Sequence, residues 1–588
     1  MLNICFLLAH RCSELSMRLQ NRLNQYQRLY ASVGNQPATV NVNELATVFC
    51  CSERHTRTLL AQFQHAGWVS WQSQAGRGKR ASIHCLTPPE SLRESYLQQL
   101  LKNGEHSAAL QLSEIDPKHL NAMLAPHLGG QWLADAPTLR IPYYRTMQAL
   151  DPQTLTGRAE QHLAHTIHAG LTRFITGEPL PQSDLAHHWQ ISNDGKTWQF
   201  FLRSQLYWHN GEQITAVQLC QQFERLRQSS RSKYSLETVS RITMPHALCL
   251  QFDLEKPDYW LAYRLADLNC LLSHPDDPLC GAGPFRLASF ATELVRLEQH
   301  PYYHLQHPFL AAIEFWITPQ LFAQKDNVSC QHPVRIMLGE KNELDDVKPV
   351  KRSTSLGFCY IAANLRRQHL TSEQAQKIIM IIQSSGLLNN LPIDHDLVKP
   401  SKEMLPGWPI PEHVLSDVPL PKTLRLLFHP PVELEFVAKA LQTCLVAEGC
   451  ELEIIYHPGR LWDNDESMAE ADLLLGDRLI SEAAEATLEN WLRQDPIWSA
   501  ILNDDDMTQQ VQRLCEIQQI PQANKRADEL RDYFYHLMQR GSITPLFNYQ
   551  YQVSAPPRVN GVQLTAWGWF DFCQAWLPPP VAEPLPAG

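Results

Sequence analysis

The stretch NVNELATVFCCSERHTRTLLAQFQHAG, residues Asn41–Gly67, decides the fold of the N-terminal part of the chain. Its first nine residues predict a short helix, and the pair Cys50-Cys51 predicts a tight turn. Ser52 is a good N-cap for a second helix, which the glycine at the end of the stretch terminates. The side chains expected to face a core are Leu45, Ala46, Phe49, Leu59, Leu60 and Phe63. Two helices joined by a tight turn predict a helix-turn-helix.

The outer face of the second helix is polar and basic. Four side chains crowd its N-terminal half and point away from the predicted core: Arg54, His55, Arg57 and Thr58. The early turns of a recognition helix reach base edges in the major groove of DNA. Together with Ser52, these residues are therefore our candidates for contact with double-stranded DNA.

A β-hairpin is predicted after this helix. Trp68–Gln72 (WVSWQ) and Ala81–Leu86 (ASIHCL) read as two strands, and the basic stretch AGRGKRA joins them. The glycines let the backbone turn and approach a phosphate, and the cations attract it. The candidates in this wing are Arg77, Gly78, Lys79 and Arg80. A solvated turn and an RNA-binding module are the alternatives, although no aromatic stacking platform accompanies the stretch.

Charge is segregated along the chain. Residues 17–86 carry eight cations and two anions, a charge of +6, so with a net charge of −11 the remainder carries −17. This asymmetry predicts a polyanionic partner for the N-terminal module alone.

The segments around the module read as helices. Leu19, Leu23, Tyr26 and Tyr30 form one face of a first helix, which the pattern starts near Met17. Residues 1–16 are then either a mis-started or a disordered segment, because MLNICFLLAHRC lacks the features of a secretion signal. After the hairpin, ESLRESYLQQLLKNG and SEIDPKHLNAMLAPHLG predict polar-faced helices that connect two parts of the chain without chemistry of their own.

Length and composition place the chain among multidomain, soluble proteins. A length of 588 residues suggests three or four cores at about 100–200 residues each. No stretch approaches the roughly 20 apolar residues that cross a bilayer, so we expect no membrane partner. The 15 cysteines never form a C-x-x-C pair, which is typical of reduced thiols and predicts a cytoplasmic protein.

The character of the chain changes at Thr138. A strand and an extended loop begin there, and an amphipathic helix and turn signals at Asn193-Asp194-Gly195 and Asn210-Gly211 follow. We expect five parts: residues 1–16, a winged helix over 17–86, a helical linker over 87–137, a body over 138–580 whose second lobe lies around 350–530, and a tail over 581–588.

The motifs of the body resemble the extracellular solute-binding proteins of the oligopeptide and nickel type. The matching segments, in order, are Leu-Ala-x-x-Trp at 185–189, Asn-Asp-Gly-x-x-Trp-x-Phe at 193–200, Trp-His-Asn-Gly-Glu at 208–212, GAGPFRL at 281–287 and the strand–helix–strand pattern at 423–455. The resemblance implies a two-lobed α/β body like a type II, cluster C periplasmic binding protein, joined to an α+β winged helix.

The combination of the two parts is similar to the SgrR family of transcriptional regulators. ELATVFCCSERHTRTLL, GWVSWQSQAGRGKR, IPYYRTMQAL and the terminal GWFDFCQAW carry this resemblance in order and spacing. It implies a DNA-binding regulator that senses a small metabolite, a sugar or sugar phosphate being the candidate, and it leaves a homodimer and the sign of regulation, activator or repressor, open.

Further candidate sites are few. The aromatic residues proposed to line the solute cleft are Trp208, Tyr302, Trp408 and Trp567. His162, His165 and His168 lack a carboxylate at suitable spacing, so we expect a solvated helix face and no metal. Asp504–Asp506 is expected to be a solvated acidic run, since it lacks the alternation of a calcium loop. No nucleophile elbow or catalytic triad is visible, so we expect neither an enzyme nor a cofactor.

Two other functions stay open at this point. A solute-binding component of an ABC-type peptide or nickel transporter would share the body, but it would need export and no basic helix-turn-helix. An enzyme acting on an oligosaccharide or peptide would need a catalytic constellation.

Overall fold

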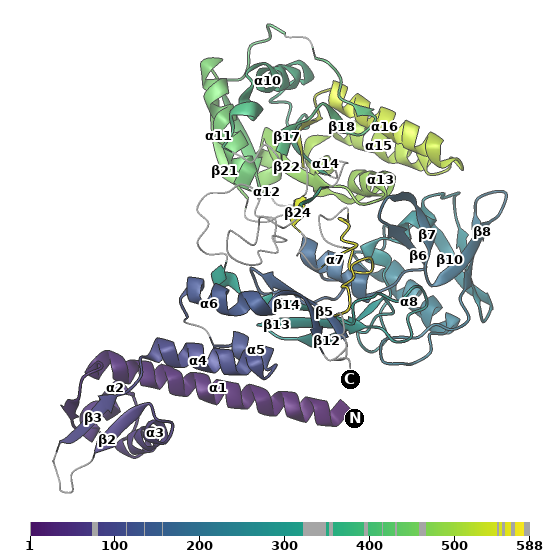
Figure 1. Ribbon diagram of the computed structural model, residues 1–588. Coiled ribbons are helices and arrows are strands. Elements are labelled where there is room, and N and C mark those ends of the chain that lie inside the picture. The colour runs from purple at the N-terminus through teal and green to yellow at the C-terminus, as the bar shows by residue number, and fades with distance from the viewer. Residues whose placement is uncertain are drawn as a thin grey trace, which may run out of the picture.

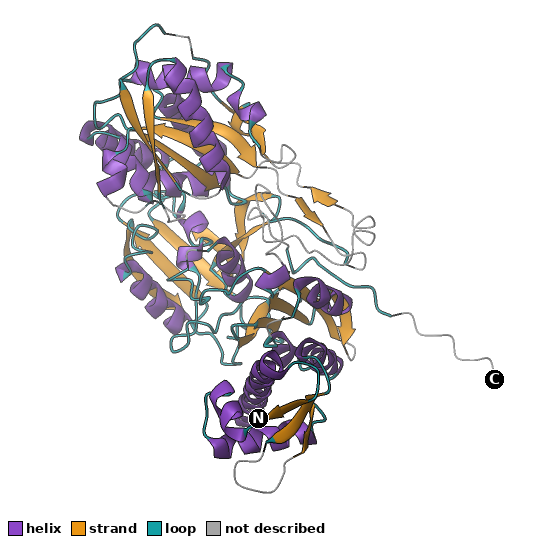
Figure 2. Cartoon of the chain, turned by 90° about the vertical axis from the view of Figure 1, so that its left-hand side faces the viewer, coloured by secondary structure: helices purple, strands orange, loops and turns teal. Residues whose placement is uncertain are grey.

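Figure 1 shows the protein as a computed structural model. The structure describes residues 2–580, apart from 73–79, 113–114, 134–135, 156, 322–348, 352–356, 393–397, 414–415, 430–431, 458–461, 463–465, 550–551, 555–558 and 566–570. A small N-terminal head lies at one end of the molecule, and a large body of two lobes follows (Figures 1 and 2).

The head is a winged helix built from three helices and a three-stranded antiparallel sheet of order β1-β3-β2. Its helix α1 starts at Leu2, whereas the apolar periodicity predicted a start near Met17. No sequence pattern predicts β1, because three residues are too few to show an alternation. The elements are α1 (Leu2–Val33), β1 (Ala38–Val40), α2 (Val42–Val48), α3 (Glu53–His65), β2 (Val69–Gln72) and β3 (Ala81–Cys85).

The turn between α2 and α3 is a Schellman motif. The N–H of Cys50 donates to the carbonyl of Thr47 (3.1 Å), and the N–H of Cys51 donates to the carbonyl of Ala46 (3.0 Å). Cys50 has φ = +51°, a left-handed backbone that usually favours glycine. The expected tight turn is therefore present, and it brings the start of α3 against the end of α2.

Aromatic side chains form the core of the head. Tyr26, Phe63 and Trp68 are almost fully buried, and the rings of Phe63 and Trp68 stack 5.3 Å apart. The Tyr26 hydroxyl lies 3.0 Å from the carbonyl oxygen of Trp68, which ties α1 to the start of the wing. The predicted inward side of α3 is confirmed, since Leu59 and Leu60 are buried.

Three linker helices follow the wing and lie between the head and the body in Figure 1. They are α4 (Pro89–Lys102), α5 (His106–Leu110) and α6 (Pro117–Leu124), and a 3-10 turn, η1 (Ala125–His127), ends the segment.

The first lobe contains a five-stranded sheet, a four-stranded sheet and one two-stranded pair. The five-stranded part has the order β12-β13-β14-β5-β4, in which only β14 and β5 are parallel. The four-stranded part is antiparallel with the order β10-β11-β9-β8. The elements of the five-stranded part are β4 (Gly129–Leu133), β5 (Ala136–Tyr143), α7 (Arg158–Ile167), β12 (Phe285–Phe290), β13 (Leu294–Gln299) and β14 (Ala312–Ile317), followed by η3 (Pro319–Leu321). Those of the four-stranded part are β8 (Ala186–Ile191), β9 (Thr197–Leu202), α8 (Ala216–Gln228), β10 (Val239–His246), β11 (Cys249–Leu254), α9 (Leu261–Arg264) and η2 (Leu268–Cys270). Before them in the chain, β6 (Thr172–Ile175) and β7 (Glu178–Ser183) pair with each other as an antiparallel two-stranded sheet.

The second lobe is built on a six-stranded sheet of order β17-β23-β16-β22-β20-β21. Its sheet elements are β16 (Gly357–Ala363), β17 (Val398–Pro400), β20 (Thr423–Phe428), β21 (Glu451–Tyr456), β22 (Leu473–Leu479) and β23 (Ile543–Tyr549). Its helices are α10 (Ser372–Ser384), η5 (Leu387–Asn390), α11 (Val432–Ala447), α12 (Glu466–Glu470), α13 (Ala484–Gln494), α14 (Pro496–Ile501), α15 (Asp504–Ile517) and α16 (Ala523–Gln539). Two further short pairs join β15 (Pro349–Lys351) with β24 (Gln552–Ser554), and β18 (Glu403–Leu405) with β19 (Trp408–Pro409).

The chain returns to the first lobe at its end. Phe572, Ala575 and Leu577 are buried in the same core cluster as Leu139 of β5. Among the helices of the described chain, none combines the length and the apolar content needed to cross a membrane.

Candidate nucleic-acid interface and solute-binding body

Side-chain caps fix the first turn of α3. The N–H of His55 donates to the Ser52 hydroxyl (3.3 Å), which confirms Ser52 as the N-cap. Thr56 is fully buried, and its hydroxyl donates to the Ser52 carbonyl (3.1 Å). The Cys51 sulfur lies 3.4 Å from the Thr56 hydroxyl, so the turn and the helix start form one hydrogen-bonded unit.

The outer face of α3 is exposed, as the sequence predicts. Arg54, His55, Arg57 and Thr58 all lie on the solvent side. Arg57 forms an ion pair with Glu53 of the same helix (2.9 Å), and both side chains remain at least half exposed. Exposed pairs of this kind contribute about 0–1 kcal/mol, so the guanidinium can exchange the carboxylate for a phosphate at little cost.

The same face is slightly hollowed. Arg57 and Thr58 line a shallow depression along α3 with Ala61, Gln62 and His65. An exposed helix that carries arginine, histidine and threonine side chains on its outer face can lie in the major groove.

The tip of the wing lies outside the described residues, and with it the candidates Arg77, Gly78 and Lys79. Arg80 is described and exposed, at the start of β3, with its guanidinium 3.8 Å from the Glu44 carboxylate. The strands β2 and β3 that carry the wing pair in antiparallel register, which confirms the predicted hairpin.

The candidate solute-binding aromatics lie in different environments. Trp208 is fully buried in the core of the four-stranded part, with its ring 6.0 Å from that of His274. Tyr302 is 56% exposed. Trp408 is half-buried and packs against the core of the second lobe, with its ring 6.0 Å from the Phe534 ring. Trp567 lies outside the described residues, so the structure shows no joint lining by these four residues.

The predicted solvated histidine face is wrong. His162 and His168 are buried, and burial lowers the pKa of both His165 and His168 to about 4. The spacing of three could not show this burial, because segments distant in the chain cover the histidines: the His168 ring lies 3.4 Å from the Leu150 carbonyl and 3.4 Å from the Ser273 hydroxyl. Within the described residues, no group of three His, Cys, Asp or Glu side chains is placed to hold a metal ion.

The acidic run Asp504–Asp506 forms the first turn of α15. Asp504 and Asp505 are exposed in the first turn of α15, where the helix dipole favours negative charge. The prediction of a solvated run is confirmed for these two residues and is wrong for Asp506, whose side chain is 12% exposed and paired with Arg540 (2.8 Å).

An alternating chain of charges joins the second lobe to the four-stranded part of the first lobe. Arg264 of α9 contacts Asp258 (2.5 Å) and Glu489 of α13 (2.9 Å). Arg493 in turn contacts Glu489 (2.5 Å) and Glu237 (2.5 Å). Burial raises the pKa of the Glu489 carboxyl, but the two guanidiniums outweigh it, so the pKa lies below its usual value. No sequence signal marks the two pairs between the lobes, Arg264–Glu489 and Arg493–Glu237, because their partners lie more than 200 positions apart.

Comparison with known proteins identifies both parts of the chain. Residues 21–135 match the family described as sugar transport-related sRNA regulator N-term, and residues 181–373 match bacterial extracellular solute-binding proteins, family 5 middle. The chain is 50% identical to the uncharacterized protein YbaE of Escherichia coli (strain K12), over 96% of this chain and 100% of that protein. It is 25% identical to the HTH-type transcriptional regulator SgrR of Yersinia pestis (strain Pestoides F), over 95% of this chain and 99% of the relative. The chain belongs to the SgrR family of transcriptional regulators.

Solved structures establish the fold of the body of this SgrR-family protein. NikA from Brucella suis, in complex with Fe(III)-EDTA, matches with a TM-score of 0.61 at 13% identity, over 75% of this chain and 100% of that chain. A dipeptide-binding protein from Pseudoalteromonas sp. SM9913, in complex with Met-Leu, matches with a TM-score of 0.59 at 16% identity, over 75% and 100%. The protein is therefore an SgrR-like regulator with a solute-binding domain.

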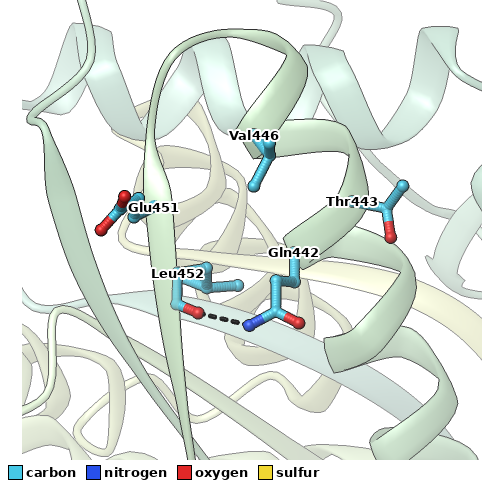
Figure 3. A pocket seen from close by; sticks show the side chains of 5 residues that line it. All are labelled: Gln442, Thr443, Val446, Glu451 and Leu452. Carbon is cyan, nitrogen blue, oxygen red and sulfur yellow. Dashed lines mark hydrogen bonds between the residues drawn. The ribbon is translucent and has the colours of Figure 1, made fainter.

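A pocket in the second lobe of this SgrR-family protein lies between α11 and the edge strand β21 (Figure 3). Gln442, Thr443 and Val446 line one side of it, and Glu451 and Leu452 line the other. The Gln442 amide donates to the Leu452 carbonyl (2.6 Å), which occupies a backbone acceptor of the edge strand. None of the predicted site residues lines this pocket.

Proposed function

We propose that this protein acts in the cytoplasm, reads double-stranded DNA with α3 and the wing, and changes that reading when its body captures a small metabolite. The observation that carries the proposal is the row of exposed polar and basic side chains on a helix whose inner face is fully packed. The body supports the second half, because its fold is that of proteins solved with small ligands.

On the DNA side, Arg54 and Arg57 are the expected groove contacts, and Arg77, Lys79 and Arg80 are the expected backbone contacts. Arginine donates two hydrogen bonds to guanine and also pairs with phosphates. The capped first turn holds the arginines in place without using their side chains.

On the solute side, the proposed ligand class is a sugar or sugar phosphate. A solute that touches both lobes binds the closed form better, and only this difference in affinity can shift the equilibrium. A coupling of about 1–3 kcal/mol between solute and DNA would be typical. Tyr302 is the exposed member of the proposed aromatic set among the described residues.

The DNA proposal is tested by the double variant Arg54→Ala/Arg57→Ala. Each lost phosphate contact lowers the slope of log affinity against log salt by about 0.9, and each lost base contact costs about 1–3 kcal/mol. The matched control is Arg28→Ala, which removes an exposed cation of α1. Electrophoretic mobility shifts over a salt series measure both quantities. Equal binding by the double variant and the wild type would remove α3 from the interface.

The solute proposal is tested by thermal unfolding of the full chain with sugars, sugar phosphates and dipeptides. A bound solute at a hundred times its dissociation constant stabilises the protein by about 2.7 kcal/mol. A rise in melting temperature with dipeptides alone would indicate a peptide ligand in place of a sugar. An unchanged melting temperature with every class of solute would contradict solute sensing. Absence of DNA binding together with a solute shift would instead favour the transport-component function.

A further inference from the structure

The linker helices cover a polar face of the five-stranded part. β5 alternates along its length, with Thr138 and Arg140 on one face and apolar residues on the other. Arg140 stands opposite Glu314 in the parallel register of β5 and β14, yet both are only 2% exposed. A sheet face that carries such charges is usually solvated, so something must bury and pair them.

The linker supplies that cover and two of the partners. Arg140 pairs with Glu314 (2.9 Å), and its remaining donors reach the His127 carbonyl (3.2 Å) and the His106 ring (3.2 Å). Burial, followed by the Arg140 charge, lowers the pKa of His106 to about 4, so the neutral ring accepts this hydrogen bond. The His106 ring also packs 5.1 Å from the ring of Trp316 on β14.

A second contact pins α5 to the turn before β13. The Glu293 carboxylate accepts hydrogen bonds from the Ser107 hydroxyl (2.7 Å) and from the Gln111 amide (2.5 Å). Both donors belong to the α5 region, and the acceptor belongs to the first lobe.

An apolar core also connects the head, the linker helices and the first lobe; we call this contact region the joint. One cluster of buried side chains includes Leu23 of α1, Leu97 and Leu101 of α4, and Leu294 and Trp316 of the first lobe. Head, linker helices and sheet therefore share one core, so the connection that the sequence predicted is packed against both of its neighbours.

We propose that the head, the linker helices and the five-stranded part move as one rigid body, and that Glu293 is a positioning residue that holds the DNA-reading head in its orientation. The proposal rests on the proposed function, because it takes the head to be the part that binds DNA and the body to be the part that binds the solute. Its consequence is that a solute acts on DNA reading through the orientation of the first lobe and not through a flexible tether.

The test is hydrogen exchange of the full chain with and without DNA. The probe is a random-sequence duplex of about 30 base pairs at low salt, at a hundred times the half-saturating concentration. A ligand at this excess stabilises every element that unfolds together with its site, so exchange in β13 and β14 of the wild type should slow by about a hundredfold, as it does in the head.

The variants Glu293→Ala and Ser107→Ala/Gln111→Ala break the joint from its two sides. In both, DNA should still protect the head, while the protection of β13 falls at least about tenfold, because charge-assisted hydrogen bonds across the joint are lost. The matched control is Glu516→Ala, whose carboxylate also accepts two hydrogen bonds but only from its own helix.

The outcomes separate the two proposals. Protection of the head without protection of β13 in the wild type would overturn the rigid joint. Full protection of β13 in both variants would overturn the role of Glu293. Protection of neither element would mean that the duplex does not bind, which contradicts the proposed function instead.

Discussion

Replacing Glu314 by glutamine should unfold the first lobe at a much lower temperature. The carboxylate is 2% exposed and accepts hydrogen bonds from Arg140 (2.9 Å), from the Trp316 indole (3.0 Å) and from Arg296. Glutamine keeps the shape and one acceptor but removes the counter-charge of Arg140, whereas Arg296 keeps its ion pair with Glu298 (3.0 Å). Breaking a buried ion pair from one side costs about 3–5 kcal/mol, against about 5–15 kcal/mol for a whole domain.

The amide oxygen of glutamine can still accept a hydrogen bond, so we expect a loss of about 3 kcal/mol in the free energy of unfolding. A loss of this size lowers the melting temperature by roughly 6–12 °C for a unit of 150–250 residues. Calorimetry at neutral pH measures the shift. The control Glu516→Gln changes a half-exposed carboxylate and should move stability by less than about 0.5 kcal/mol.

The stability difference between the wild type and Glu314→Gln should become smaller in acid. Burial raises the pKa of Glu314, but Arg140 and its other partners outweigh it and hold the pKa below its usual value of 4.5. A depressed carboxyl pKa stabilises the fold above the unfolded-state value and loses this effect as the pH falls through the folded-state value. The gap between wild type and variant should therefore narrow below pH 4.5. A gap under about 1 kcal/mol at neutral pH, or one that widens in acid, would refute the reasoning.

Three further outcomes are expected. Ser52→Ala removes the acceptor for the His55 N–H, so the head should lose about 1 kcal/mol in chemical denaturation, and its DNA affinity should fall; unchanged values would deny the cap its role. Cys50→Gly relieves a left-handed backbone at a non-glycine residue, so the free energy of unfolding measured by chemical denaturation should rise by about 1 kcal/mol. A lower free energy of unfolding would show that the thiol contributes more than the strain costs. Glu489→Gln leaves Arg264 without a charged partner on α13 and should cost about 3 kcal/mol, seen as earlier thermal unfolding of the second lobe; an unchanged melting curve would show that the charge chain contributes little.

The parts that the sequence predicts correctly depend on local signals. The cap at Ser52, the spacing of Leu59, Leu60 and Phe63, and the stop at Gly67 all act within one helix, so α3 and its exposed face follow from the sequence alone. The body motifs likewise depend on turns a few residues long.

The parts that it misses depend on partners distant in the chain. Arg140 and Glu314 are 174 positions apart, and no local pattern shows that a linker helix will cover them. The same holds for Arg264 and Glu489, which are 225 positions apart. His168 shows the converse error, because a helical spacing that looks solvated is buried by segments far away in sequence.

The amide of Gln442 has a consequence for the behaviour of the whole protein at high concentration. Strand β21 is the outer strand of its sheet, and such strands invite pairing with another molecule. By occupying the Leu452 carbonyl, the side chain blunts that edge, in the way other proteins use a bulge or a lysine. The loss of this hydrogen bond in a Gln442→Ala variant would leave the Leu452 carbonyl free to accept a strand from a second molecule.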